Sequence, residues 1–473
     1  MIHEGIFFIL IIRYMNIADI EVEKASISVK TKLQHVLDCL QKPKEVHNTI
    51  NKVEILLEIN YNTPISYYSY HPKIISIGPY HHGKNNLLSM ENTKYKYLNN
   101  LLSRCVDKDR NMLDRFVEAA CKMEENVRDC YGEVLVNIKQ DEFLEMLVLD
   151  GCFLIEFLLK FHFHEVYQSM SMANWSIPLI RKDLLLLENQ IPFSVLEIFY
   201  SIAQIKEPSN IRDLAIEFLS NGTITSIPEQ YHEIVPYHLL HLLHISLHPN
   251  FASNSDDDHV LTSSLLLQQI PFTWVLSWLL KYVFGILNTN TNLSIAKLVP
   301  TAVELQNFGV KFITVVQQNH NFLNIQFENG ILKIPSLIIN FETVSLVVNL
   351  LAFEQSRADV GSYVTNYTAF MSSIVKTTCD VTALQGFHII KRQLYNNDDV
   401  VMFFSRIGDR EIRIWKEDDR NYLDGIIQEV NEFCNNPIYR FKVMVKRNFT
   451  RSRTIITLIS TTVMLFSAWN TIM

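Results

Sequence analysis

Glycine and proline, the two residues that most often interrupt helices, are scarce in this chain. Its 473 residues include 13 glycines and 14 prolines, against 28 phenylalanines and 19 tyrosines. Because glycine weakens a helix and proline breaks it, their scarcity favours long helices. Apolar residues make up 48% of the chain and charged residues 19%, which excludes a disordered protein and favours a large buried core.

Cysteine occurs in a small, odd number and without a C-x-x-C pair. The seven cysteines therefore lack the spacing that indicates a disulfide framework or a zinc site. Cys121 and Cys152 lie in apolar, helix-like surroundings, which is typical of free thiols in a reducing compartment. Five N-x-[ST] sequons would matter only in an extracellular domain. They begin at Asn174, Asn221, Asn292, Asn366 and Asn448.

Basic residues are outnumbered by acidic ones. The net charge is −8, whereas binding a phosphate backbone requires a basic face, so we predict no nucleic-acid partner. Basic residues cluster only directly before the C-terminal stretch, where they suit an anionic membrane surface. The members of this cluster are Lys442, Lys446, Arg447, Arg451 and Arg453.

The last twenty residues, 454–473, contain no charged side chain. A helix of this length reaches about 30 Å, the thickness of the hydrocarbon core of a bilayer. Its many threonines make the span marginal, but the positive residues beside it favour insertion with the bulk of the chain in the cytosol. We predict a single-pass transmembrane helix at 454–473 that contacts membrane lipid, with the plasma membrane as its location. The alternative is a threonine-rich helix packed on the folded domain.

The motifs of several catalytic classes are absent: there is no G-x-S-x-G, G-x-G-x-x-G, H-E-x-x-H or protein-kinase set. Residues Gly78 to Lys84 do fit the phosphate-loop pattern G-x-x-x-x-G-K. However, Pro79 has no N–H to offer a phosphate, and Asn85 replaces the Ser or Thr that binds Mg²⁺. We therefore predict neither nucleotide binding nor a cofactor.

Histidines form a candidate metal site. His241, His244 and His248 would share one helix face, with His238 nearby, and three imidazoles can bind Zn²⁺ or Cu²⁺. No acidic residue lies between His238 and His248. The pattern therefore favours a polar helix face, and we assign no metal ligand.

Two carboxylates five residues apart, Asp183 and Glu188, could serve as an acid–base pair. The run Leu184–Leu187 buries this segment, and buried polar side chains are normally hydrogen-bonded to the backbone. We interpret Glu188 and the following Asn-Gln as groups that satisfy backbone atoms where a helix ends, and we assign no catalytic residue. The alternative is an enzyme with a pocket near His81, His82, Asp183 and Glu188. The adjacent His81 and His82 otherwise indicate a surface turn.

The hydrophobic period divides the chain into an N-terminal extension, 1–45, and one large helical domain, 46–450. An acidic loop at 250–258 and a linker at 288–294 interrupt the domain. In the region 310–335, apolar and polar residues alternate, and Asn329-Gly330 predicts a hairpin because a type I′ turn needs two positive φ angles. The expected fold is mainly α with a small antiparallel β-sheet (α+β), plus the C-terminal transmembrane helix. The expected helices cover 91–102, 112–126, 141–160, 177–190 and 193–202.

Several segments, in this order, resemble the plant "domain of unknown function 247" family over roughly residues 50 to 473. The Leu-Glu-Asn-Gln-Ile-Pro segment at 187–192 is the most unusual of them. The others are Ser-Ile-Gly-Pro-Tyr-His-His-Gly at 76–83, Leu-Asp-Gly-Cys-Phe at 149–153, Thr-Ala-Val-Glu-Leu at 301–305, Gly-Val-Lys-Phe at 309–312, and Ala-Phe-Glu-Gln at 352–355.

The resemblance implies a land-plant protein with one mostly helical domain and a C-terminal membrane anchor, and it brings no established catalytic residues. Some members of that family are implicated in pollen–stigma self-incompatibility in grasses, and others in growth or stress responses. Since no convergent catalytic set is present, we predict a membrane-anchored, non-enzymatic recognition or signalling protein with an unidentified protein partner.

Overall fold

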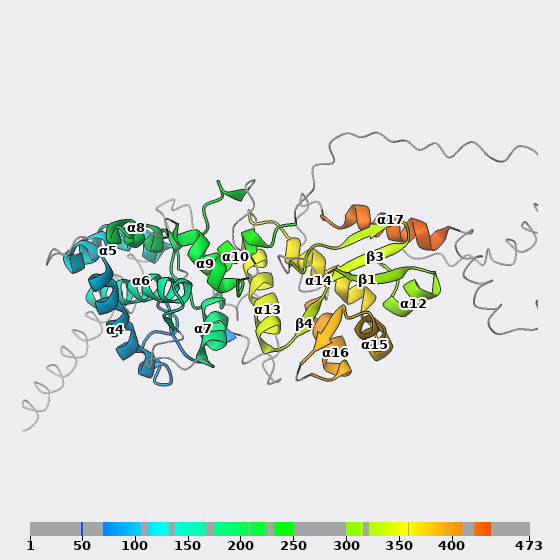
Figure 1. Cartoon of the computed structure of the whole chain (residues 1–473), viewed down its shortest axis with the longest axis horizontal. Coiled ribbons are helices and arrows are strands. Elements are labelled where there is room, and N and C mark those ends of the chain that lie inside the picture. The colour runs from blue at the N-terminus through cyan, green and yellow to red at the C-terminus, as the bar shows by residue number, and fades with distance from the viewer. Residues whose placement is uncertain are drawn as a thin grey trace, which may run out of the picture. The chain divides into compact units, whose positions relative to one another are not determined.

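Helices dominate the computed structural model of the chain, as its low glycine and proline content predicts (Figure 1). The chain divides into two units, residues 1–47 and 48–473. All described residues belong to the second unit. They are 49–50, 70–105, 112–131, 138–166, 175–249 without 207, 209, 223 and 225–230, 299–408 without 316–320, 358 and 394, and 421–436.

The first group of helices packs around α6, Gln140–His162, which contacts α4, α5, α8 and α9. Nearly every position of α6 from Met146 to Leu159 is buried, which confirms the helix expected at 141–160. Gly151 of α6 allows a close approach, because a Cβ there would lie 2.8 Å from the Phe199 ring of α8. The other helices of this group are α4 (Leu88–Arg104), α5 (Met112–Asp129), α7 (Ser176–Leu184), α8 (Phe193–Ala203), α9 (Ile211–Leu219) and α10 (Leu239–Ser246).

One helix boundary differs from the sequence prediction. The helix expected over 177–190 ends at Leu184, and residues 185–192 form turns and extended chain instead. Apolar residues follow one another there without a helical period, and side chains of the turn itself supply the hydrogen bonds that a longer helix would have made. Pro192 is the N-cap residue of α8, so the start of the helix expected at 193–202 is confirmed.

The second group combines short strands with helices. The hairpin predicted at Asn329-Gly330 is confirmed: β2 (Gln326–Glu328) and β3 (Ile331–Pro335) are antiparallel, with φ of 52° and 77° at the two turn residues. The other elements are α12 (Ala302–Asn307), β1 (Lys311–Val315), β4 (Leu337–Ile339), α13 (Phe341–Ser356), α14 (Tyr363–Ile374), α15 (Thr378–Gly386), β5 (Ile390–Arg392), α16 (Asn397–Ile407) and α17 (Asp424–Asn435).

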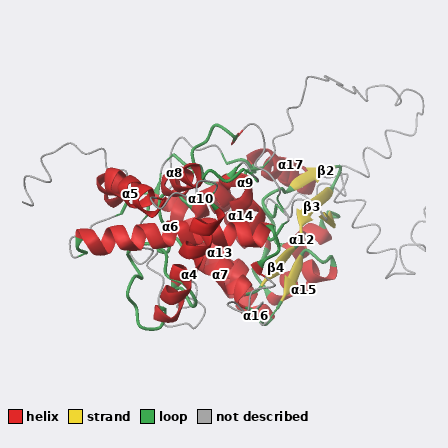
Figure 2. Ribbon diagram, turned by 60° about the vertical axis from the view of Figure 1, so that its left-hand side comes forward, coloured by secondary structure: helices red, strands yellow, loops and turns green. Residues whose placement is uncertain are grey.

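The prediction of an antiparallel sheet is wrong in one respect. The three-stranded sheet has the order β1-β3-β2, and β1 runs parallel to β3. Strands β4 and β5 form a second, parallel pair. Alternation along a strand determines which side chains share a face, here Phe312, Leu332 and Phe327 in register, but it does not determine strand direction. Figure 2 shows these strands gathered beside α12, α15 and α17.

A continuous hydrophobic core includes residues of both groups, which meet where α7 and α10 contact α13. Among the described residues, no helix combines the length and the apolar character needed to cross a bilayer. Four of the expected segments lie entirely outside the described residues: the extension at 1–45, the acidic loop at 250–258, the linker at 288–294 and the expected transmembrane helix at 454–473.

Candidate functional site

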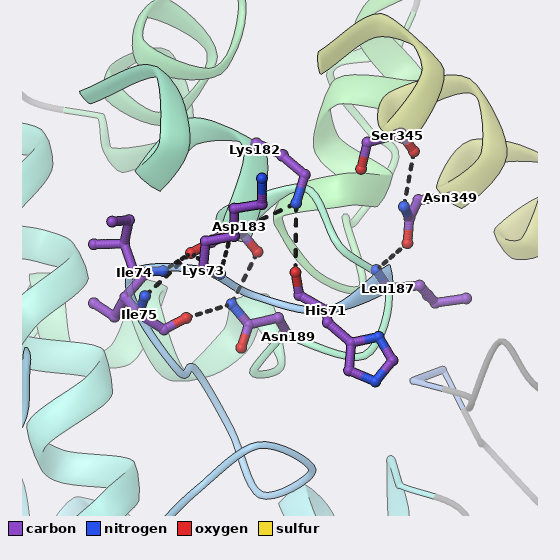
Figure 3. Close-up of polar contacts among 10 residues, drawn as sticks. All are labelled: His71, Lys73, Ile74, Ile75, Lys182, Asp183, Leu187, Asn189, Ser345 and Asn349. Atoms are coloured by element: carbon purple, nitrogen blue, oxygen red, sulfur yellow. Dashed lines mark hydrogen bonds and ion pairs between the residues drawn. The ribbon is translucent and has the colours of Figure 1, made fainter. Parts of the chain in front are cut away.

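Asp183, at the end of α7, holds an extended segment that lies 110 residues earlier in the chain (Figure 3). Its Oδ2 accepts the backbone N–H groups of Lys73, Ile74 and Ile75 at 2.9, 2.6 and 3.1 Å, and its Oδ1 also accepts from Lys73 at 3.0 Å. Lys182 reinforces the contact, since its Nζ lies 3.8 Å from Asp183 Oδ1 and donates to the carbonyl of His71. The carboxylate is therefore occupied by backbone donors.

Asn189 and Gln190 supply further hydrogen bonds of this turn. Asn189 Oδ1 accepts from Ile77 N–H at 2.7 Å, and its Nδ2 donates to the carbonyls of Ile75 and Asp183 at 3.1 and 2.9 Å. Gln190 Nε2 donates to the carbonyls of Leu184 and Leu186 at 2.7 and 2.8 Å. These contacts confirm the interpretation that the two amides satisfy backbone groups where a helix ends.

Asn349 of α13 fastens the same turn to the second group of helices. Its Oδ1 accepts the N–H of Leu187 at 2.9 Å, and its Nδ2 donates to the carbonyl of Ser345 at 2.8 Å (Figure 3). Asn349 is fully buried. A buried amide with both ends bonded strongly specifies one arrangement of the two segments, because separating them leaves unpaired polar atoms.

A buried ion pair fixes the loop that imitates a phosphate loop. Asp150 of α6 accepts the N–H of Gly78 at 2.7 Å through Oδ2, and its Oδ1 lies 2.6 Å from Lys94 Nζ. Burial opposes the charge of Lys94, but the Asp150 and Glu91 carboxylates outweigh it and hold the pKa of Lys94 above its usual value. Gly78 has φ of +75°, and a Cβ there would lie 2.3 Å from the carbonyl oxygen of Gln190.

Of the four residues of the alternative enzyme pocket, His81 and Glu188 contact each other. His81 Nε2 lies 3.5 Å from Glu188 Oε2, and its Nδ1 accepts from Lys84 Nζ at 2.7 Å. His82 Nε2 instead lies 3.9 Å from Glu142 on α6. The structure therefore brings His81 and Glu188 together, while Asp183 is held by the backbone. The expectation of two surface histidines is wrong for His81, which is 1% exposed because its ring lies against the Glu188 turn.

The four histidines at 238–248 are buried, so the prediction of a polar helix face is wrong. His241 and His244 lie in α10, which packs against α9 and α13, while His238 is its N-cap residue and His248 follows its last turn. His238 Nε2 lies 3.2 Å from the Thr49 carbonyl, and its Nδ1 accepts the N–H of His241. His241 Nδ1 accepts the N–H of Tyr237 at 3.0 Å. Burial lowers the pKa of His238 to about 3 and that of His241 to about 2, so both rings are neutral.

Within the described part of the chain, no group of three or more His, Cys, Asp or Glu side chains is arranged to hold a metal ion. At two of the four histidines, hydrogen bonds to the backbone oppose metal binding. Nδ1 of both His238 and His241 is already occupied by a backbone N–H donor, so neither atom is open to a metal.

Glu354 of α13 is a buried polar residue that was not selected as a candidate from the sequence. It is 1% exposed, and its two carboxylate oxygens accept hydrogen bonds from three residues of α10 and α14. Their donors are Val364 N–H and His244 Nε2, both at 2.8 Å from Oε1, and Thr365 N–H and hydroxyl, at 2.8 and 2.7 Å from Oε2. The signal was available, since Asn349 and Glu354 interrupt an otherwise apolar helical run, and such buried polar positions require partners.

Comparisons with known proteins identify the family. The family model DUF247, described as "Plant protein of unknown function", matches residues 59–467. A UPF0481 protein of Arabidopsis thaliana is 30% identical over 379 residues, covering 77% of this chain and 74% of the relative. A putative UPF0481 protein of the same plant is 22% identical over 449 residues, covering 80% and 81%. No solved structure matches the chain. The chain therefore belongs to the DUF247 family of plant proteins of unknown function.

Proposed function

We propose that this chain is a membrane-tethered, non-enzymatic recognition or signalling protein whose helical body faces the cytosol and binds a protein partner. The observation that carries the proposal is the uncharged stretch at 454–473 with five basic residues directly before it. Positive residues beside a span remain on the cytoplasmic side, where they also attract anionic lipid headgroups.

The body supports the non-enzymatic part of the proposal. The polar residues that stand out in the sequence bind backbone atoms or each other: Asp183 accepts three N–H groups, Asn189 bonds three backbone groups, and Asp150 pairs with Lys94. Groups engaged in this way stabilise the fold, and in that state they do not transfer protons to a substrate.

Fractionation tests the tether. The intact chain and a form ending at residue 453 are expressed in leaves, and the extracts are separated by ultracentrifugation before and after an alkaline carbonate wash. We expect the intact chain in the washed pellet and the shortened form in the supernatant, because only the former carries the apolar stretch. Recovery of the intact chain in the supernatant would refute the tether.

Asn221 provides a test of orientation. It begins the sequon at 221–223 and lies in an exposed turn after α9. A cytosolic body leaves this site unmodified, whereas a body on the other side of the membrane presents it to the glycosylation machinery. We expect no change in electrophoretic mobility after deglycosylation of the leaf-expressed protein. A shift that Asn221→Gln removes would contradict the cytosolic orientation.

A second candidate function rests on one specific arrangement, in which Lys84 Nζ is hydrogen-bonded to His81 Nδ1 and His81 Nε2 lies 3.5 Å from Glu188 Oε2. A histidine between a carboxylate and a lysine can move protons, which keeps the enzyme alternative open to test. Turnover that disappears on Glu188→Gln or Asp183→Asn, while the protein remains folded, would favour the enzyme over the recognition protein.

A further inference from the structure

Two histidines and a carboxylate form a buried hydrogen-bonded series at the end of α10. His248 Nε2 lies 3.4 Å from His244 Nδ1, and His244 Nε2 lies 2.8 Å from Glu354 Oε1. The three side chains are at most 7% exposed. Glu354 also caps α14 through the N–H groups of Val364 and Thr365, so the series joins α10, α13 and α14.

The hydrogen bonds determine which ring nitrogens carry protons. An ionised carboxylate only accepts, so His244 Nε2 is the donor to Glu354. The neutral His244 ring then accepts at Nδ1, and His248 donates to it from Nε2. This leaves His248 Nδ1 as a buried acceptor with no hydrogen-bond partner. The series therefore ends in one open nitrogen atom.

We propose that His248, His244 and Glu354 form a proton-uptake site that reinforces the junction of α10, α13 and α14 when the pH falls. A proton adds to His248 Nδ1, and the proton on His248 Nε2 moves to His244 Nδ1. His244 becomes an imidazolium that donates from Nε2 to Glu354 and from Nδ1 to His248 Nε2. One proton enters, no hydrogen bond is lost, and the bond between the two rings reverses its direction.

The surroundings place the positive charge on His244. The Glu354 carboxylate lies directly against His244, while His248 contacts the rings of Tyr231 and Tyr363. Tyr422 lies beyond Tyr363, and its ring centroid is 5.8 Å from that of Tyr363. An imidazolium therefore gains an ion pair at His244 that His248 does not offer, and a charge-assisted hydrogen bond is stronger than a neutral one.

The other charged groups near α10 are engaged elsewhere. On α9, Arg212 binds Glu197, Glu217 binds His162, and Asp213 is exposed. Arg357 and Asp359 pair with each other beside Tyr237, whose ring stacks on His241 rather than on His244 or His248. Glu354 is thus the acidic group in hydrogen-bond contact with the pair.

The two preceding histidines cannot follow the same route. Nδ1 of His238 and Nδ1 of His241 each accept a backbone N–H, so adding a proton there breaks a hydrogen bond. The pair His244–His248 differs because its acceptor nitrogen faces another imidazole, which can exchange donor and acceptor roles. Uptake is therefore confined to the C-terminal half of the histidine cluster.

Nitrogen-15 NMR of the histidine rings tests this in the full chain in detergent micelles, because ring shifts distinguish the two tautomers and the imidazolium. At pH 7.5 we expect both rings to carry the proton on Nε2. On acidification, His244 should become doubly protonated while His248 changes to the Nδ1–H tautomer at the same midpoint. Doubly protonated His248, an unchanged His248 tautomer, or a His244 that stays neutral until the protein unfolds would each overturn the proposal.

Two variants and one internal control sharpen the measurement. Glu354→Gln removes the carboxylate charge that faces His244 Nε2, so double protonation of His244 should require a lower pH than in the native chain. If that variant does not fold, His248→Phe keeps an aromatic ring but removes the acceptor, and it should lower the His244 midpoint as well. His162, which binds Glu217 and is touched by neither substitution, is the internal reference ring in all forms. An unchanged His244 midpoint in either folded variant would contradict the relay.

Discussion

Replacing Asp183 by Asn is expected to release the segment at 73–75 from the end of α7. In the native protein three N–H groups converge on one carboxylate, at 2.6 to 3.1 Å. An Asn oxygen at the Oδ2 position can still accept from them, but without a full negative charge. The Asn Nδ2 then takes the place of Oδ1, 3.0 Å from Lys73 N, where two donors face each other.

The expected magnitude follows from these contacts. A hydrogen bond to a charged group contributes about 1 kcal/mol more than a neutral one, so three weakened bonds cost about 3 kcal/mol. At about 1.4 kcal/mol for each factor of ten, local opening should become more frequent by about a hundredfold. Because Asp183 is buried, water does not restore the lost bonds.

Amide hydrogen exchange followed by mass spectrometry measures this opening directly on peptides that cover residues 71–77. We expect about a hundredfold faster exchange in Asp183→Asn at those amides, with little change in the middle of α6. Glu118→Gln is the matched control, since it also removes one carboxylate charge but from an exposed ion pair with Lys122. Unchanged exchange at 73–75 in a folded Asp183→Asn protein would refute the assigned role.

Three further predictions concern the same body. Gly78→Ala should lower the free energy of unfolding by more than Gly83→Ala does, because both glycines have positive φ but only the Gly78 Cβ meets a backbone oxygen, at 2.3 Å; equal melting temperatures would contradict this. Lys94→Met leaves Asp150 buried without its cation and should lower the free energy of unfolding, measured in urea, by about 3 to 5 kcal/mol. Lys122→Met, on the surface, should change this free energy little. Acid should also destabilise the fold. His238 and His241 have pKa values of about 3 and about 2 in the folded protein. Their unfolded pKa is about 6.5, so the unfolded chain binds more protons as the pH falls below that value. The loss reaches about 2 kcal/mol per histidine at pH 5. The free energy of unfolding should therefore be lower at pH 5 than at pH 7.5, and His241→Phe should remove the share of this difference that His241 contributes. An unchanged difference would show that His241 is protonated in the folded protein.

The local chemistry of the sequence was sufficient for several elements of secondary structure. The helix at 141–160, the start of the next helix after Pro192 and the hairpin at Asn329-Gly330 each follow from a period or a turn preference within a few residues. The structural use of Asn189 and Gln190 was also accessible, because their bonds to the carbonyls of Asp183, Leu184 and Leu186 span four to six residues.

Contacts between distant segments were decided only by the tertiary structure. The sequence indicated that Asp183 would bind backbone, but not that the backbone would be that of residues 73–75. It placed the histidines on one helix face, but whether that face meets water or α13 depends on helix packing. It set the alternation of β1 and β3, but not their parallel direction. Periodicity and turn preference act over a few residues, whereas burial and pairing depend on which segments meet, and that is determined by the free energy of the whole core.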